Sequence, residues 1–303
     1  MTRPRIVLLA VCLLVTGLAA LVRSQQQDWS KVEVRTEKLA DGLFMLRGAG
    51  GNIGVSARAD GVVLVDDDYP QLTDKVLAAV KAISPQPVRF VVNTHWHGDH
   101  TGGNETLGKS GIAIVAHDNV RKRMSVEQSL PAFKMTVPPS PKAALPIVTF
   151  STDVTFHLNG DELHAVYVQP AHTDGDAIVH FRKANVLHMG DLFFNGMYPF
   201  IDLGTGGSVD GMIAAADLAL KMCTPGTRII PGHGPMADAA ALRAYRDVIV
   251  TARDRIKPMV AAGKTLADLK AAAPTKDLDA KWGQGFMNGE RFAEIVFRSY
   301  GGK

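Results

Sequence analysis

The chain has 303 residues, of which 46% are hydrophobic and 21% are charged, so it is long enough for one large domain or two small ones with a sizeable core. Its formal net charge is +3, and three arginines near the N-terminus, in a stretch without acidic residues, account for all of it. No block of lysine or arginine runs along the sequence, which counts against a nucleic-acid-binding protein such as a nuclease.

The N-terminal segment is typical of an export signal. Two arginines precede an uncharged, mostly apolar run from Ile6 to Val22. We expect residues 1–24 to be removed as a signal peptide and the mature protein, residues 25–303, to be exported to the periplasm. Because the run is near the lower length limit of a membrane-spanning helix, a retained anchor is the alternative. Of the cysteines, Cys12 and Cys223, only the second would remain, which excludes an intramolecular disulfide.

The first half of the remaining chain alternates strand and helix patterns. Short β runs broken by glycine, apolar residues at helical spacing and continuous apolar runs predict strands within 32–66, at 88–92 and at 112–115, and helices at 72–83 and 119–130. The segment Pro131 to Pro146 carries five prolines and few strand or helix signals, so we interpret it as a long loop.

The second half repeats this style. Strands are predicted at 154–158, 162–168, 177–181, 185–189 and 228–230, and helices at 209–222, 237–261, 265–272 and 290–300. The long helix is expected to be strained or broken at Pro258. Strands in two runs, each flanked by helices, predict an α/β fold, an αββα sandwich of two mixed sheets with helices outside. We see no domain linker, and the helical C-terminal tail spans about 237–303.

A cluster of metal-ligand side chains follows the predicted strand that ends at Val92. His95, His97, Asp99 and His100 fall within six residues. Alternation in an extended segment places His95 and His97 on the same side, and a turn at Gly98 brings the other two round to a neighbouring position. Imidazole and carboxylate groups suit zinc, iron or manganese, so this run predicts a metal site.

Three further side chains of the same kind follow predicted strands and are flanked by glycine. They are His172 in PAHTDGD, Asp191 in GD and His233 in PGHG. Together with the first cluster they supply seven candidate metal ligands, which are His95, His97, Asp99, His100, His172, Asp191 and His233.

This arrangement resembles the metallo-β-lactamase superfamily. The run from Asn93 to Asn104, NTHWHGDHTGGN, matches the long motif of the family, and the three later residues follow in its order and at its usual spacing. The resemblance covers roughly residues 33–236 and implies the metallo-β-lactamase fold. It also implies two metal ions, which we take to be Zn²⁺, with iron or manganese as alternatives.

The resemblance assigns the ligands to two groups. The first metal takes His95, His97 and His172, and the second takes Asp99, His100 and His233. Asp191 occupies the position that bridges both metals in thioesterase-like members. In the zinc β-lactamases closest to this motif, a cysteine commonly stands there and a lysine three residues later holds the antibiotic's carboxylate. Here that residue is Phe194, which counts against efficient β-lactamase activity but leaves the hydrolase interpretation intact.

We therefore expect an exported, β-lactamase-like dinuclear zinc hydrolase that uses a metal-bound hydroxide to cleave an amide, ester or thioester bond of a small molecule. Asp99 is the expected catalytic residue, as a ligand and as an orienter of the nucleophile or a proton shuttle. The alternatives are a hydroxyacylglutathione-hydrolase-like thioesterase or a lactonase. A nuclease of the same fold is disfavoured by the charge, and a non-enzymatic metal-binding module by the complete ligand set. We expect no nucleic-acid partner and membrane contact only through the export signal; natural substrate, metal identity and oligomeric state stay open.

Several neighbours are candidates for supporting roles. One of the aspartates 66–68, with Asp66 or Asp67 favoured, is expected to orient a metal-bound histidine. Thr173, Asp174 and Asp176 are expected to hold the loop around His172. His188 is interpreted as structural, whereas Trp96 and the segment 193–200 are candidates for an apolar substrate mouth, with core packing as the alternative.

Overall fold

The computed structural model describes residues 27–303, so the predicted signal segment lies outside the described residues. Trp29–Lys31 forms a short 3-10 turn in a unit that ends at Lys31, and residues Val32–Lys303 form the second unit, which holds every element discussed below. Among the described residues, no helix is both long enough and apolar enough to cross a membrane.

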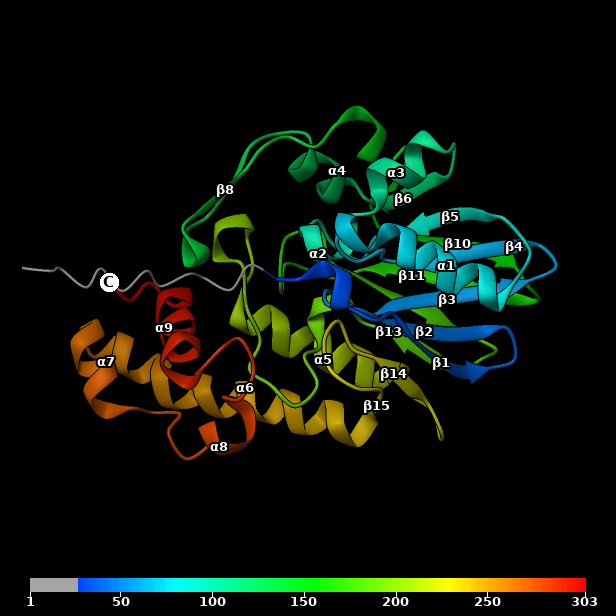
Figure 1. Cartoon of the computed structure of the whole chain (residues 1–303). Helices are drawn as coiled ribbons and strands as arrows, with labels where there is room; N and C mark the ends of the chain where they lie inside the picture. Colours follow the sequence, from blue (N-terminus) through cyan, green and yellow to red (C-terminus); the bar gives the residue numbers. More distant parts are fainter. Residues whose placement is uncertain (1–26) are drawn as a thin grey trace, which may run out of the picture. The chain divides into compact units, whose positions relative to one another are not determined.

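Two mixed sheets form the centre of this unit (Figure 1). The first has the order β1 (Arg35–Ala40), β2 (Leu43–Arg47), β3 (Ile53–Arg58), β4 (Gly61–Val65), β5 (Val88–Val92), β6 (Ala113–His117) and β9 (Val148–Phe150). The second has the order β10 (Asp153–Leu158), β11 (Asp161–Tyr167), β12 (Ala177–Phe181), β13 (Val186–His188), β14 (Arg228–Ile230) and β15 (Ala237–Asp238). Each sheet contains both parallel and antiparallel pairs, as β3–β4–β5 and β12–β13–β14 illustrate.

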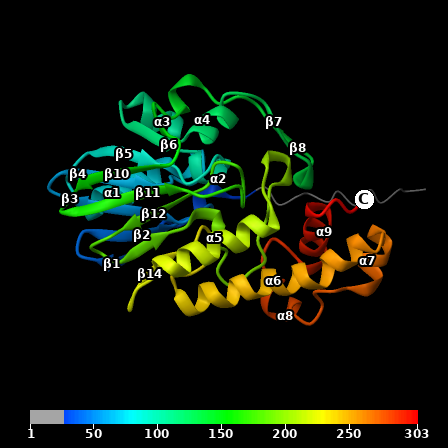
Figure 2. The same cartoon turned by 180° about the vertical axis from the view of Figure 1, so that it is seen from behind.

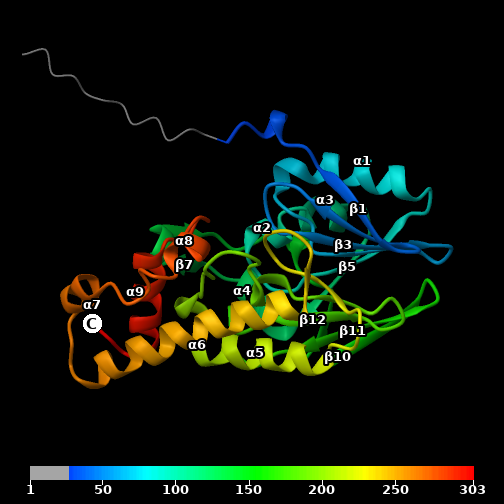
Figure 3. The ribbon, with the colours of Figure 1, turned by 90° about the horizontal axis from the view of Figure 1, so that it is seen from below.

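Helices lie outside the two sheets. They are α1 (Thr73–Ile83), α2 (Gly98–Thr101), α3 (Asn104–Lys109), α4 (Asp118–Met124), α5 (Val209–Met222), α6 (Ala239–Ala261), α7 (Leu266–Ala272), α8 (Asp279–Trp282) and α9 (Gly289–Ser299). Figure 3 shows α1 over the first sheet and α5 with α6 under the second. The predicted αββα sandwich is therefore confirmed.

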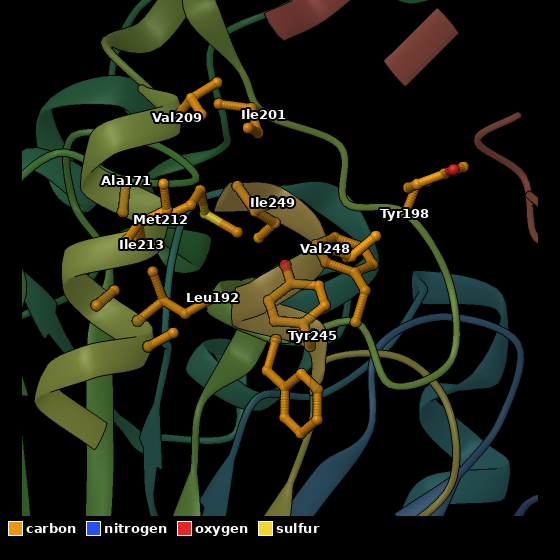
Figure 4. Close-up of a cluster of buried hydrophobic side chains, with 14 of the residues drawn as sticks. Ala171, Leu192, Tyr198, Ile201, Val209, Met212, Ile213, Tyr245, Val248 and Ile249 are labelled. Carbon is orange, nitrogen blue, oxygen red and sulfur yellow. The ribbon is translucent and has the colours of Figure 1, made fainter. Parts of the chain in front are cut away.

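Apolar faces explain this layering. Between the sheets, Val63, Val65 and Val92 of the first sheet pack in one buried cluster with Val179 and Phe181 of the second. The opposite face of the second sheet packs against α5 and α6, where Met212, Tyr245 and Ile249 are fully buried (Figure 4). Burying apolar area on both sides of the sheet is the main favourable term that fixes these layers.

The turns follow the local sequence. Asn159 and Gly160 have φ values of 58° and 71° and join β10 to β11 as the predicted tight turn, because asparagine and glycine tolerate the left-handed region that a two-residue hairpin requires. The strands at 154–158, 162–168, 177–181 and 228–230 and the helix at 209–222 are confirmed to within one residue at each end.

Three predictions for the elements were wrong in part. The helix expected at 119–130 ends at Met124, and its last residues form β7 (Gln128–Leu130). The expected loop 131–146 contains β8 (Met135–Val137), which pairs with β7 because the prolines lie outside the three paired residues. Helix α6 is not broken at Pro258 and runs on to Ala261, although proline lacks the backbone N–H that would bond to the carbonyl group of Asp254.

Candidate metal centre

Four strand ends bring the seven candidate ligands together. His95 and His97 follow β5 directly, and α2 then carries Asp99 and His100. His172, Asp191 and His233 follow β11, β13 and β14, which run in the same direction in the second sheet. Because the carboxyl ends of parallel strands lie at one edge of a sheet, residues up to 138 positions apart in sequence meet there.

The seven side chains form two groups. His95, His97, His172 and Asp191 form one, and Asp99, His100 and His233 form the other. Within each group, one nitrogen or oxygen atom from each residue lies within 4.8 Å of those from the others. For the six residues other than Asp191, the grouping is the one that the family resemblance implies.

Asp191 lies between the two groups. Its Oδ2 atom is 3.4 Å from Nε2 of His172 and 3.8 Å from Nε2 of His95. Its Oδ1 atom is 3.0 Å from Nε2 of His100 and 3.3 Å from Nε2 of His233. One carboxylate oxygen thus faces each group, which is the placement that a bridging ligand needs.

The histidine rings of the first group are fixed from outside by hydrogen bonds. His97 Nε2 lies 3.2 Å from Oδ2 of Asp202, and His172 Nδ1 lies 2.9 Å from the carbonyl oxygen of Phe200. The remaining nitrogens, His97 Nδ1 and His172 Nε2, face each other at 2.9 Å. Metal-binding histidines are commonly oriented in this way through the ring nitrogen that does not bind the metal.

Asp66 fixes the second group in the same manner. Its Oδ2 atom lies 2.8 Å from Nδ1 of His100, and its two oxygens accept hydrogen bonds from the backbone N–H and the hydroxyl of Thr94. The predicted contact between one of the three aspartates and a histidine of the cluster is therefore present at Asp66. Asp67 and Asp68 instead accept hydrogen bonds from the backbone of Gly103 and Gly50.

Unsatisfied buried atoms test whether a metal would fit. Within the described part of the chain, Nε2 of His95, Nε2 of His100 and Oδ1 of Asp191 are buried without a hydrogen bond of acceptable geometry. Buried polar atoms are almost always satisfied in folded proteins, so three such atoms aimed at one place indicate a missing ligand. Nitrogen and carboxylate-oxygen donors fit divalent zinc, iron or manganese.

Charges within the cluster shift its pKa values in opposite directions. Burial lowers the pKa of His95 well below its usual value, and the nearby His100 adds to this. Burial also opposes protonation of His233, but the carboxylates of Asp191 and Asp99 outweigh it and raise the pKa of His233 to about 9. Burial raises the pKa of Asp99, yet His100 and His233 together lower it to about 2. Metal ions must therefore displace a proton from His233 at neutral pH.

This pKa predicts how the metal-free protein responds to pH. A histidine whose pKa is raised from 6.5 to about 9 stabilises the fold fully below pH 6.5, and the contribution is lost as the pH rises through about 9. In protein stripped of metal by a chelator, we expect His233→Gln to lower Tm clearly near pH 6 and to have little effect near pH 10. The control is His157→Gln, at an exposed position on β10, which should not change Tm in a pH-dependent way. If His233→Gln lowered Tm by the same amount at pH 6 and pH 10, the prediction would be contradicted.

The loop that carries His172 is held from inside, as the sequence predicts. Asp176 accepts hydrogen bonds from the backbone N–H groups of His172 and Thr173 and from the hydroxyl of Thr173. Asp174 forms an ion pair with Arg123 at 2.7 Å and does not belong to the cluster. His188 is also structural, because it is buried with Nε2 at 3.0 Å from the carbonyl oxygen of Asn52.

A glycine next to Asp191 allows the groups to meet. A Cβ atom on Gly232 would lie 2.1 Å from Oδ1 of Asp191 and 2.6 Å from the backbone of Gly190. Contacts this short do not occur, so the loop after β14 can approach Asp191 only with glycine at this position.

Two supporting contacts were missed by the sequence analysis, those of the Asp202 side chain and of the Phe200 carbonyl group; Phe200 itself was considered only for the substrate mouth. Both lie between β13 and α5, where no periodic pattern predicts which side chain faces the cluster. The only signal was a single aspartate after the apolar pair Phe200-Ile201, and this is too common to be diagnostic.

The predicted apolar mouth is mostly core. Trp96 is 4% exposed, and Phe193, Phe194 and Tyr198 are fully buried. Two exposed aromatic residues from other segments lie near the cluster. The ring centroid of Phe133 is 4.8 Å from that of Phe200, and the ring centroid of Phe286 is 6.2 Å from that of His233.

Comparisons with known proteins identify the family of this chain. The family described as the metallo-beta-lactamase superfamily matches residues 47–236. A hydroxyacylglutathione hydrolase from Rhodospirillum rubrum is 30% identical over 142 residues, which are 46% of each chain. The alpha subunit of a 2,4-dinitroanisole O-demethylase from a Nocardioides strain is 27% identical over 54% of this chain and 46% of its own. The chain thus spans about half the length of these curated relatives.

Solved structures share the fold. A metallo-beta-lactamase from Pontibacter korlensis has a TM-score of 0.59 at 20% identity, covering 72% of this chain and 99% of its own. An inverting sec-alkylsulfatase from Pseudomonas sp. has a TM-score of 0.67 at 17% identity, covering 89% of this chain and 50% of its own. The chain belongs to the metallo-beta-lactamase superfamily, a family of metal-dependent hydrolases.

Proposed function

We propose that this protein is an exported hydrolase that holds two zinc ions on its seven clustered side chains and cleaves an amide, ester or thioester bond of a small molecule. The observation that carries the proposal is the position of Asp191, whose two oxygens face the two groups separately. The exported location rests on the N-terminal sequence alone.

When bound, the two ions would supply Lewis acidity and lower the pKa of water to near neutrality. The chain's own residues do the positioning. Asp202, Asp66 and the carbonyl group of Phe200 hold three histidine rings in fixed orientations. Asp99 is the more accessible of the two carboxylates in the cluster, with 21% of its side chain exposed against 6% for Asp191. We assign Asp99 to orienting the attacking water and moving its proton.

Two residues favour an ester or thioester over a β-lactam. Asp191 stands where the related zinc β-lactamases commonly carry cysteine, and Phe194 stands where they carry the lysine that holds the antibiotic. Phenylalanine has no charge with which to bind a substrate carboxylate. Phe194 is also fully buried and stacks on His233, with ring centroids 5.3 Å apart. The hydroxyacylglutathione hydrolase relative points in the same direction.

The test is hydrolysis by purified, zinc-loaded protein of a p-nitrophenyl ester, a hydroxyacyl thioester of glutathione and a chromogenic cephalosporin. We expect turnover of the ester or the thioester that is lost on chelation and restored by zinc, with the cephalosporin at least about tenfold slower. Faster cleavage of the cephalosporin would favour a β-lactamase. Bis-p-nitrophenyl phosphate is the fourth substrate, and its cleavage without turnover of the other three would favour a phosphodiesterase and contradict the proposal.

A further inference from the structure

A cavity of about 560 Å³ lies beside the metal centre, between the β7–β8 hairpin and α9. Figures 1 and 2 show this hairpin extending from α4 toward the C-terminal helices. The walls are mainly apolar, with Leu130 and Phe133 on the hairpin side and Met287 and Ile295 on the helix side. A volume of this size is in the range of small-molecule binding sites.

The cavity shares its inner wall with the first group of histidines. Phe200 and Asp202 line it, and these residues also fix His172 and His97 by hydrogen bonds. The ring of Phe200 lies with its centroid 5.9 Å from that of His97 and 5.8 Å from that of His172. Phe200 therefore lies between the cavity and the first group of histidines, and a substrate that reacts at the cluster would place its non-reacting part on the cavity side of this ring.

One positive charge in the cavity wall has no carboxylate partner. Arg298 forms an ion pair with Glu294 at 2.8 Å, and Asp202 is bound by His97 and Thr205. Among the described residues, no ion pair or side-chain hydrogen bond is found for the guanidinium group of Arg291. Arg291 also lies in the first turn of α9, where the helix dipole disfavours a cation, so helix stability does not explain an arginine there.

We propose that this cavity binds the non-reacting part of the substrate, and that this part is an apolar chain ending in a carboxylate held by Arg291. The proposal rests on the proposed function, because it places the reacting carbonyl at the metal centre. A guanidinium group can donate two parallel hydrogen bonds to a carboxylate, which suits it to this task. Phe133, which is 43% exposed, would cover the apolar chain from the hairpin side.

Matched esters test the proposal. The probes are p-nitrophenyl butyrate, hexanoate and octanoate, together with the p-nitrophenyl monoesters of succinic, adipic and suberic acids. At the chain length that spans the cavity, we expect kcat/KM for the carboxylated ester to exceed that of its uncharged counterpart about tenfold. Arg291→Gln should remove this preference and leave the uncharged ester within about twofold of wild type.

The control is Arg255→Gln, which removes the same charge from an arginine on α6 that pairs with Asp277 and does not line the cavity. It should keep the preference of the wild type. No preference at any chain length, or a preference that survives in Arg291→Gln, would overturn the proposal.

A binding measurement separates this proposal from the proposed function. A methyl ketone with a terminal carboxylate, such as 8-oxononanoate, cannot be hydrolysed, so calorimetry reports its binding whether or not the protein turns over esters. We expect its Kd to rise about tenfold in Arg291→Gln and to stay unchanged in Arg255→Gln. Equal binding to the wild type and to Arg291→Gln would overturn the cavity proposal. Differential binding without hydrolysis of any ester, thioester or amide tested would retain the cavity proposal and contradict the proposed reaction.

Discussion

Replacing Asp191 with alanine is expected to lower kcat by more than about 100-fold and to reduce the bound metal. Loss of an outer hydrogen-bond partner alone commonly costs 10- to 100-fold in metal affinity or activity, and Asp191 faces both groups directly. Its removal would also leave His100 and His233 with less negative charge to balance their protonated forms. In the described part of the chain, Asp191 is the only side chain that directs one oxygen to each of the two groups.

Metal content and turnover should be measured on the same samples of wild type and Asp191→Ala. Asp217→Ala provides the matched control, since this aspartate lies on α5 and pairs with Arg246 away from the cluster. The control should behave as wild type. Full activity of Asp191→Ala with an unchanged metal content would contradict the bridging role.

Replacing Asp66 with alanine is expected to destabilise the protein by about 3–5 kcal/mol, the usual cost of removing one partner of a buried charged pair. The Asp66 side chain is inaccessible to solvent and serves three donors, which are the backbone N–H of Thr94, its hydroxyl and Nδ1 of His100. Among the groups near His100, the carboxylates of Asp191, Asp99 and Asp66 outweigh burial and raise its pKa well above the usual value. Without Asp66, the protonated ring of His100 and the backbone N–H of Thr94 would each lose a hydrogen-bond acceptor.

Urea unfolding of the metal-free protein would measure this loss of stability. Asp66 has a φ of 64°, which asparagine tolerates better than alanine, so Asp66→Asn separates the backbone cost from the loss of charge. Asp41→Ala, in which an exposed ion pair with Arg58 is broken, should cost less than about 1 kcal/mol. A loss of similarly small size for Asp66→Ala would show that Asp66 does not hold the site.

The sequence alone predicts the parts of the fold that local patterns encode. All of β4 and the last two residues of β5 are buried, and the histidine motif follows β5 as expected. The three later ligands were also predictable, because His172, Asp191 and His233 stand in turns that contain glycine after apolar strands. Their convergence depends only on strands that run in the same direction.

What the sequence does not predict depends on contacts between distant segments. Asp202 meets His97 across 105 positions, and nothing near Asp202 marks it as a partner. The cavity beside the cluster arises where the hairpin of Leu130 and Phe133 lies opposite Ile295 of α9. The β7–β8 hairpin is local but was also not predicted, because its strands are only three residues long and prolines follow each of them.

The central claim is that these seven side chains hold two metal ions, and counting the metal in the purified protein tests it most directly. After exchange into zinc-containing buffer and removal of excess metal, elemental analysis should give two zinc ions per chain, with none retained after chelation. Fewer than one ion per chain in folded protein would contradict the claim.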